Sequence, residues 1–335
     1  MKNTPLVSIG IAVFNGSDTL KRCLDSIVNQ TYKNLEIIIV DDCSSDGSFN
    51  ICKDYNLLDR RIVLKKNKIN KGIIQNFNDL FNYSTGEYFL WADQDDIRDL
   101  SYLENIIKIM EKDKSIALCH SNTAVFFGTT DNVMHINTMQ QVSNKDSLYR
   151  RYWNLLWHYN DTHVCGVFRT SLLKKTKLWK KINGSSNCLI FNMALLGKIA
   201  NINKTLFYYS GKAIFKRTNM KKELKAQTKI TAPKIYYPGL ILFNNQINDI
   251  IFSKLSIKDK LILIFFTLFN FISINFAKII FRFFYSFYGN SIPKFIIYIC
   301  RILYPVPKDI NYVIKPENNL DYYPALYKYY PLIKL

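Results

Sequence analysis

The 335-residue sequence predicts an α/β fold, a mostly parallel sheet flanked by helices, followed by a helical C-terminal extension. Two observations predict the sheet: short β-branched runs alternate with segments of helical spacing, and these runs end in polar or acidic residues. A change of composition near residue 215 predicts the extension. We therefore expect a ligand-binding domain over residues 1–215 and a basic, aromatic-rich region over residues 216–335.

The first half of the chain supplies the strands and helices of this sheet. Strands are expected at Val7–Phe14, Leu35–Val40, Arg61–Leu64 and Glu87–Ala92. Between the first two, apolar residues from Leu20 to Val28 recur at helical spacing, and a further helix is expected from Ile73 to about Tyr83. This alternation favours parallel strands with helices on both faces, and such sheets bind ligands beyond the carboxyl ends of their strands.

Acidic residues lie where two of the expected strands end. Asp41 and Asp42 follow one strand, and Asp93, Asp95 and Asp96 follow another. Carboxylates this close together at a strand end can bind one hard cation, Mg²⁺ or Mn²⁺, together with a diphosphate. Taken alone, each cluster is also compatible with a polar turn that caps the next helix.

Several motifs together are more specific than any one of them. The chain resembles the family 2 glycosyltransferases of the GT-A fold across roughly residues 6–215. The matching residues are Val7-Ser8-Ile9 to Phe14-Asn15, Ser26-Ile27-Val28-Asn29-Gln30-Thr31-Tyr32, Glu36 to Gly47 with Asp41-Asp42 at its centre, Asn70-x-Gly72-x-x-x-Asn76-Phe77, and Asp93-Gln94-Asp95-Asp96-Ile97. The last two look like a bacterial subset that includes many rhamnosyltransferases and O-antigen enzymes.

The resemblance implies a Rossmann-like GT-A domain and a role for each matching position. Phe14 corresponds to an aromatic residue that stacks on the nucleobase, and Asp42 to the carboxylate that binds the base. Asp93 corresponds to a residue that contacts the ribose or the donor sugar, and Asp95 to the metal-binding aspartate of a D-x-D motif. The other expected donor-binding residues are Asn15, Asn70, Gly72 and Asn76.

The resemblance also implies a reaction. We expect an inverting transfer, dependent on Mg²⁺ or Mn²⁺, from a nucleotide-sugar donor such as a UDP-hexose or dTDP-rhamnose. The expected acceptor is a lipid-linked glycan in the synthesis of O-antigen, capsule or lipopolysaccharide. Sugar identity and linkage stay open, because donor choice depends on a few side chains whose positions vary within the family.

One departure from the family concerns the general base that must take a proton from the acceptor hydroxyl. The family usually places an acidic residue shortly before a helix that ends in Gly-Lys, which looks like residues 189–198 here. That position reads Ser185-Ser186, and residues 162–222 contain no Asp or Glu. Asp161 or His163, on an expected strand before a helix at Ser171–Trp179, are the alternative bases.

The C-terminal extension points to an anionic membrane surface. Residues 1–150 carry 17 Lys+Arg against 19 Asp+Glu, whereas residues 151–335 carry 28 against 7, a balance of +21. Residues 261–277 are apolar but contain Thr267, Asn270, Ser273 and Asn275, so an interfacial helix fits better than a spanning one. A buried helical subdomain is the remaining alternative. The Lys-rich segment 216–234 would then contact lipid headgroups.

The expected location is cytoplasmic, peripheral on the inner face of the bacterial membrane. The N-terminus has no signal-peptide pattern, and the seven scattered cysteines include no C-x-x-C pair and indicate no disulfide framework. Nucleic-acid binding is disfavoured, because the basic residues are interleaved with long aliphatic runs. A catalytically weak or dead member that acts as a scaffold in polysaccharide assembly is the alternative function, motivated by the missing carboxylate. The oligomeric state is not predicted.

Overall fold

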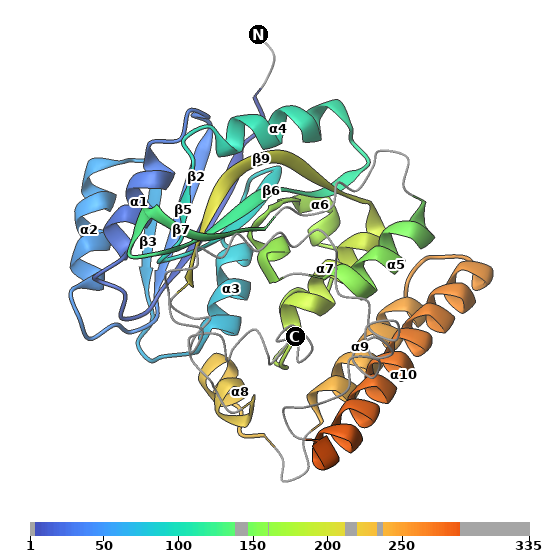
Figure 1. The fold of residues 1–335 in the computed structure, drawn as a ribbon. Helices are drawn as coiled ribbons and strands as arrows, with labels where there is room; N and C mark the ends of the chain where they lie inside the picture. Colours follow the sequence, from blue (N-terminus) through green and yellow to red (C-terminus); the bar gives the residue numbers. More distant parts are fainter. Residues whose placement is uncertain (1–3, 138–146, 160, 212–219, 233–236, 289–335) are drawn as a thin grey trace.

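The computed structural model describes residues 4–137, 147–159, 161–211, 220–232 and 237–288, and one twisted sheet runs through them (Figure 1). Its strand order is β3-β2-β1-β4-β8-β6-β9-β5, and β7 pairs with β6. The strands are β1 (Val7–Val13), β2 (Leu35–Asp41), β3 (Ile62–Lys66), β4 (Tyr88–Asp93), β5 (Ile97–Arg98), β6 (Ile116–Phe127), β7 (Thr129–Asn137), β8 (Val167–Arg169) and β9 (Lys198–Ser210).

The four strands predicted in the first half are confirmed within one or two residues at each end, and they pair in parallel. β1 lies between β2 and β4, and β3 adds to the outer side of β2. Beyond β4 the sheet becomes mixed, because β8 runs antiparallel to both β4 and β6 while β6 and β9 are parallel. The chain therefore reverses its winding between β1 and β4, the place where such sheets bind ligands.

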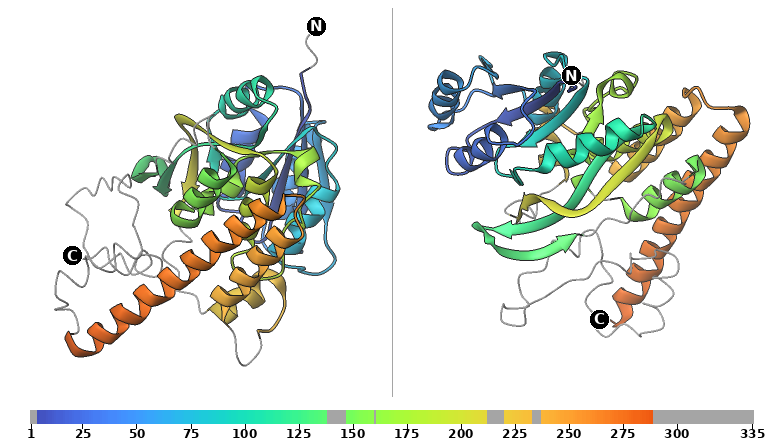
Figure 2. Two further views of the ribbon diagram at one scale, coloured as in Figure 1. Left: turned by 90° about the vertical axis from the view of Figure 1, so that its right-hand side faces the viewer. Right: turned by 90° about the horizontal axis from the view of Figure 1, so that it is seen from above.

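Helices cover both faces of the sheet, as the alternating pattern predicts (Figures 1 and 2). One core cluster includes side chains of α1 and α4, and the second includes side chains of α3, α5 and α7. The helices of this part are α1 (Leu20–Val28), α2 (Ser48–Leu58), α3 (Ile73–Asn82), α4 (Tyr102–Lys112), α5 (Leu148–His158), α6 (Thr170–Leu173) and α7 (Ser185–Leu196).

Three elements around the candidate base differ from the prediction. The residues around His163 form a 3₁₀ helix, η1 (Asp161–Cys165), and not a strand. The helix expected at Ser171–Trp179 is the single turn α6. The helix expected from residue 189 already begins at Ser185, because the preceding Gly184 adopts a left-handed conformation (φ 77°) at its N-cap.

The C-terminal part described by the structure consists of α8 (Met220–Thr228), α9 (Pro238–Ile251) and α10 (Ile257–Tyr288). α9 and α10 lie side by side against α7 and α5 (Figures 1 and 2). Ile250 and Leu263 from this pair are buried in the same core cluster as α7. Of the helices described, none combines the length and the hydropathy needed to cross a membrane. The domain division at residue 215 stays a prediction, and residues 289–335 lie outside the described residues.

Candidate functional site

The carboxyl ends of β1, β2 and β4 bring the predicted acidic residues to one edge of the sheet, which we call the donor edge. In the strand register, Val13 of β1 lies opposite Asp41, and Ala12 lies opposite Asp93. Asp42 follows directly on Asp41. The two acidic clusters therefore lie on either side of the end of β1, as the parallel arrangement requires.

The loop after β1 fixes the backbone of Phe14 and leaves its ring exposed. The Phe14 amide donates to Gln94 Oε1 at 2.9 Å, and Gln94 Nε2 donates to the Phe14 carbonyl at 3.0 Å. Asn15 adopts a positive φ of 47°, and its Oδ1 accepts from the Ser45 amide at 2.9 Å. The Phe14 side chain is 44% exposed. The exposed ring is accessible for stacking, and nucleobase binding by Phe14 stays a prediction.

Asp42 is buried and holds the loop that leads into α3. Its Oδ1 accepts from Asn67 Nδ2 at 2.9 Å and from the Lys71 amide at 2.8 Å. Its Oδ2 accepts from the Gly72 amide at 2.9 Å. Three donors fix the carboxylate and hence the shape of this loop. The sequence suggested base binding or a polar turn for Asp42, and the loop-holding role emerges from the tertiary contacts.

The donor-binding residues predicted in this loop, Asn70, Gly72 and Asn76, belong to the same network. Asn70 Oδ1 accepts from the Gly72 amide at 3.1 Å, and Asn76 Nδ2 donates to the Gly72 carbonyl at 3.2 Å. Gly72 has a φ of +84°, and a Cβ atom there would lie 2.6 Å from the carbonyl oxygen of Gln227 in α8. Part of the basic segment 216–234 therefore lies against the donor edge. Its predicted contact with lipid headgroups stays a prediction, and residues 216–219 and 233–234 are outside the described residues.

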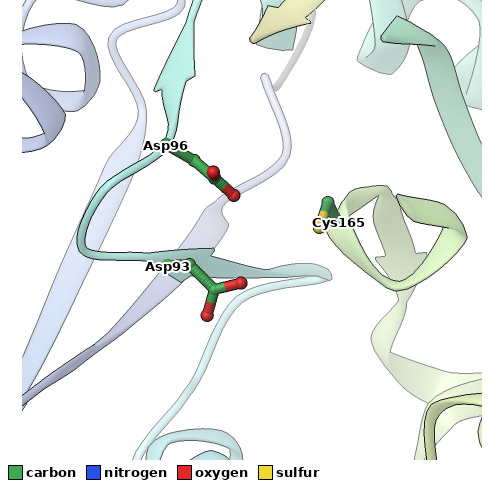
Figure 3. Close-up of side chains that lie close together, drawn as sticks. All are labelled: Asp93, Asp96 and Cys165. Atoms are coloured by element: carbon green, nitrogen blue, oxygen red, sulfur yellow. The ribbon is translucent and has the colours of Figure 1, made fainter. Parts of the chain in front are cut away.

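At the end of β4, the side chains of Asp93 and Asp96 converge with that of Cys165 (Figure 3). One potential ligand atom of each lies within 4.8 Å of the others. Asp96 Oδ1 accepts from the Ser210 amide at 2.9 Å, whereas Asp96 Oδ2 is buried without a hydrogen-bond partner among the described residues. The Asp95 side chain, predicted as the metal ligand, is half-buried beside them.

This cluster has the electrostatic character of a cation site. Burial and, to a smaller extent, the neighbouring charge of Asp95 raise the pKa of Asp93 to about 6. Burial and the charge of Asp93 raise the pKa of Asp96 well above its ordinary value. Burial likewise keeps the Cys165 thiol protonated, and a neutral thiol is a poor ligand for a hard cation. The carboxylates are therefore the groups that fit Mg²⁺ or Mn²⁺.

Arg98 supplies a buried positive charge next to these carboxylates. Its Nη2 donates to the Trp91 carbonyl at 2.9 Å, and its guanidinium carbon lies 4.9 Å from the centre of the Phe207 ring. The charge of Arg98 lowers the pKa of both Asp93 and Asp96, against the larger effect of burial. Sequence reasoning missed Arg98, because an arginine after an acidic turn is normally solvated.

The candidate base is built from η1 and the start of α7. Ser186 Oγ donates to Asp161 Oδ1 at 3.0 Å, and the Tyr159 hydroxyl donates to the same oxygen at 2.9 Å. The Asp161 side chain is exposed. Ser186 occupies the position where the resemblance places an acidic residue, so Asp161 brings a carboxylate to that position from a different element. Ser186 and Tyr159 were not singled out by the sequence as partners of Asp161.

His163, the other candidate base, has a different environment. It is buried, its ring stacks on Tyr159 at 5.8 Å between centroids, and its edge meets His120 at 4.9 Å. Burial, together with the charge of His163, lowers the pKa of His120 to about 3. Packed aromatic neighbours of this kind are typical of a structural histidine, so Asp161 is the better placed of the two to meet an acceptor hydroxyl.

The candidate base and the acidic cluster both act electrostatically on two side chains, Cys165 and Tyr209. Burial raises the pKa of the Cys165 thiol, and the charges of Asp96, Asp93 and Asp161 raise it further. The same three carboxylates act in this way on the Tyr209 hydroxyl. Cys165 and Tyr209 therefore lie within electrostatic reach of both acidic groups.

Comparison with curated proteins finds bacterial glycosyltransferases. An uncharacterized glycosyltransferase of Haemophilus influenzae is 38% identical over 35% of this chain and 36% of its own length. The glycosyltransferase GlyA of Streptococcus pneumoniae is 28% identical over 62% of this chain and 29% of its own. A third relative, of Escherichia coli, is named UDP-Glc:alpha-D-GlcNAc-diphosphoundecaprenol beta-1,3-glucosyltransferase WfaP and is 38% identical over 32% of this chain and 43% of its own. The matched part is thus less than half of each relative.

Solved structures share the fold. S. aureus TarS (residues 1–349) in complex with UDP superposes with a TM-score of 0.59 at 15% identity, covering 81% of this chain and 72% of its own. The Pyrobaculum calidifontis mannosyltransferase PcManGT in complex with GDP-Man and Mn²⁺ superposes with a TM-score of 0.51 at 15% identity, covering 83% and 76%. Residues 8–176, just over half of this chain, match the family described as Glycosyl transferase family 2. With its parallel donor edge and its acidic strand ends, the chain therefore belongs to the family 2 glycosyltransferases.

Proposed function

We propose that this glycosyltransferase moves a sugar, with inversion, from a nucleotide-sugar donor to a lipid-linked glycan acceptor in the synthesis of a bacterial surface polysaccharide. UDP-hexose and dTDP-rhamnose are the donor classes, with UDP-hexose ahead. The names of relatives support this order: TarS was solved with UDP and with UDP-GlcNAc. The name of WfaP gives UDP-Glc as its donor and a diphosphoundecaprenol-linked sugar as its acceptor.

The observation that carries the proposal is the hydrogen bond between Asp161 and Ser186 at the start of α7. Inversion in a single displacement needs a base on the acceptor side of the sugar. Asp161 takes the proton of the acceptor hydroxyl as the oxygen bonds to the anomeric carbon, and the bond to the nucleoside diphosphate breaks. Ser186 and Tyr159 orient the carboxylate before the reaction and need no further rearrangement.

The donor is held at the opposite side of the site. Phe14 stacks on the nucleobase, and the loop fixed by Asp42 forms the pocket wall beside it. Asp93, Asp95 and Asp96 would hold the divalent cation, which neutralises the charge that develops on the leaving diphosphate. The buried Oδ2 of Asp96, which has no hydrogen-bond partner among the described residues, fits this group, because a carboxylate oxygen in that state otherwise costs stability. Arg98 lowers the pKa of Asp93 and Asp96 and so favours their ionised form, against the larger effect of burial.

Nucleotide binding tests the donor half of the proposal. Melting temperatures are compared with UDP, dTDP and GDP, each with and without Mn²⁺, for the wild type and for Asp95→Ala. At a given concentration, a ligand that binds more tightly stabilises the folded protein more. We expect one nucleotide to stabilise the wild type only with metal, and Asp95→Ala to lose this effect. If no nucleotide shifts the melting temperature under any condition, the donor assignment is wrong.

The alternative function is a scaffold in an assembly complex that binds a donor without transferring it. This alternative arose because serines occupy the position where the family has an acidic residue. The hydrogen bond between Asp161 and Ser186 weakens it, since it brings a carboxylate to that position. Turnover with a lipid-linked acceptor decides between the two. Donor binding without transfer to any such acceptor would favour the scaffold.

A further inference from the structure

Between Leu261 and Phe276, helix α10 buries several polar residues against the protein while large apolar residues stay exposed on its other side. Thr267 is 1% exposed, and Asn270 and Ser273 are also buried. The Phe265 side chain, by contrast, is 62% exposed. In a soluble protein a surface helix normally turns its apolar side inward and its polar side to water.

The buried polar side chains on the inner face of α10 already have contacts within the protein. Thr267 Oγ1 lies 3.2 Å from the Tyr152 hydroxyl, and Asn270 Nδ2 donates to the Leu156 carbonyl at 3.1 Å. Leu263 is fully buried in the core cluster that also contains side chains of α5 and α7. The helix is therefore oriented by specific contacts with α5, and rotation to bury its apolar side would break them.

From Ile257 to Phe276, the part of α10 whose side chains the structure describes, the outer face is a continuous apolar stripe. Its large side chains are separated by one, three or four positions, which places them along one side of the helix. They are all more than two-fifths exposed: Ile257, Leu261, Phe265, Leu268, Phe269, Ile272 and Phe276. A contiguous stripe of this size marks an interaction surface, unlike the single apolar residues scattered over most proteins.

Two features beside the stripe identify the partner. Lys254 and Lys258 are exposed where α10 begins, and the half of the chain that contains it carries the balance of +21. Two tryptophans of α5 border the stripe: the Trp153 ring lies 6.0 Å and the Trp157 ring 6.4 Å from that of Phe269. Basic residues and tryptophans around an apolar helix face are the combination that binds the interface of an anionic bilayer.

We propose that the outer face of α10 docks this enzyme on an anionic lipid bilayer, with the helix lying in the plane of the interface. The stripe enters the boundary between headgroups and acyl chains, and the lysines contact the headgroups. The proposal deepens the proposed function, because a lipid-linked acceptor is presented at that same surface. It does not depend on sugar transfer.

The docking helix is connected to the acceptor side of the site. The inner face of α10 holds α5, and the chain leaves the end of α5 toward Asp161 in η1. The neighbouring α9 contacts the start of α7, where Gln246 Nε2 donates to Asn187 Oδ1 at 2.8 Å. A bilayer under α10 would therefore lie next to the elements that carry the candidate base.

Vesicle co-sedimentation of the full-length chain tests the proposal. The vesicles contain either phosphatidylcholine alone or equal parts of phosphatidylcholine and phosphatidylglycerol. The variant Leu261→Ser/Phe265→Ser removes two stripe side chains without adding charge. The matched control, Leu57→Ser/Leu58→Ser, changes two exposed apolar residues of α2, which are 81% and 85% exposed. Melting temperature and nucleotide binding establish that both variants are folded.

We expect the wild type and the α2 control to bind the anionic vesicles. The α10 variant should bind them at least about tenfold more weakly, since it loses the burial of two large side chains. Equal binding by both variants would overturn the proposal, as would equal binding to phosphatidylcholine alone or no vesicle binding by the wild type. A wild-type dimer that the α10 variant converts to a monomer, without vesicle binding, would assign the stripe to a second copy instead. Failure of sugar transfer with intact vesicle binding would count against the proposed function alone.

Discussion

Lys180 and Asp249 form an ion pair, with 2.7 Å between Nζ and Oδ2, that joins the segment before α7 to helix α9. Asn192 Nδ2 of α7 also donates to Asp249 Oδ2, at 2.8 Å. The Asp249 carboxylate is buried, so its charge depends on these two partners. The pair thus fastens the C-terminal helices to the helix that begins beside Asp161.

Removing one partner of this pair should destabilise the protein more than removing both. We expect Asp249→Ala to lower the free energy of unfolding by about 3 kcal/mol, because it leaves the Lys180 ammonium largely buried without its counter-charge. Lys180→Met/Asp249→Leu should recover part of the loss. Urea denaturation measures both, and an Asp249→Ala protein as stable as the wild type would show that the pair is not structurally important.

Asp161→Asn should abolish most turnover and leave donor binding unchanged. We expect kcat to fall about 10²–10⁴-fold, the usual contribution of a general base. His163→Gln should change kcat much less, since His163 is packed between rings. Single-turnover transfer to a lipid-linked acceptor, with nucleotide binding measured in parallel, checks this. Near-wild-type turnover in both variants would exclude both residues as the base.

Gly72→Ala should disturb the loop held by Asp42 because of a backbone clash. Gly72 and Gly128 both have a positive φ, of 84° and 79° respectively. A Cβ atom added at Gly72 would lie 2.6 Å from the carbonyl oxygen of Gln227, whereas one added at Gly128 would have no atom within 4 Å. Gly128→Ala therefore measures the conformational cost alone, about 1 kcal/mol. We expect Gly72→Ala to be destabilised more than this and to bind nucleotide more weakly. Equal thermal shifts for the two variants would contradict the clash.

His120 should make the protein less stable as the pH falls below neutrality. Burial lowers its pKa in the folded protein to about 3, below the ordinary 6.5. Between these two values the unfolded chain binds a proton that the folded protein does not bind. The stabilisation is complete above pH 6.5 and is lost progressively as the pH falls toward 3. Between pH 6.5 and pH 5 the loss should be about 2 kcal/mol.

The measurement for His120 is urea unfolding at both pH values in the wild type and in His120→Gln. The difference between the two proteins cancels the contributions of the buried aspartates, which both contain. We expect the wild type to lose more stability than the variant on acidification. Parallel pH profiles would mean that His120 is already protonated or solvated in the folded protein.

The N-terminal sheet and its donor edge were largely predictable from local patterns. A β-branched run such as residues 35–40, in a chain that alternates with helices, predicts a buried parallel strand. Because parallel strands end on the same side of a sheet, the positions of Asp42 and Asp93 along the chain were enough to predict that they share one edge. The mixed half was not predictable, because the three-residue β8 has too short a pattern to indicate its direction or its partners. The 3₁₀ helix around His163 was not predicted either, because its five residues are too few to show a pattern.

The sequence by itself determined the family, the parallel core and the acidic strand ends, because these depend on residue periodicity and on the geometry that all parallel sheets share. Only the tertiary structure decided that Asp161 meets Ser186 from 25 positions away, that Arg98 is a buried charge, and that α10 turns its polar side inward. These relationships depend on which surfaces pack together. A side chain's environment is then set by residues distant in the chain, and local sequence does not encode them.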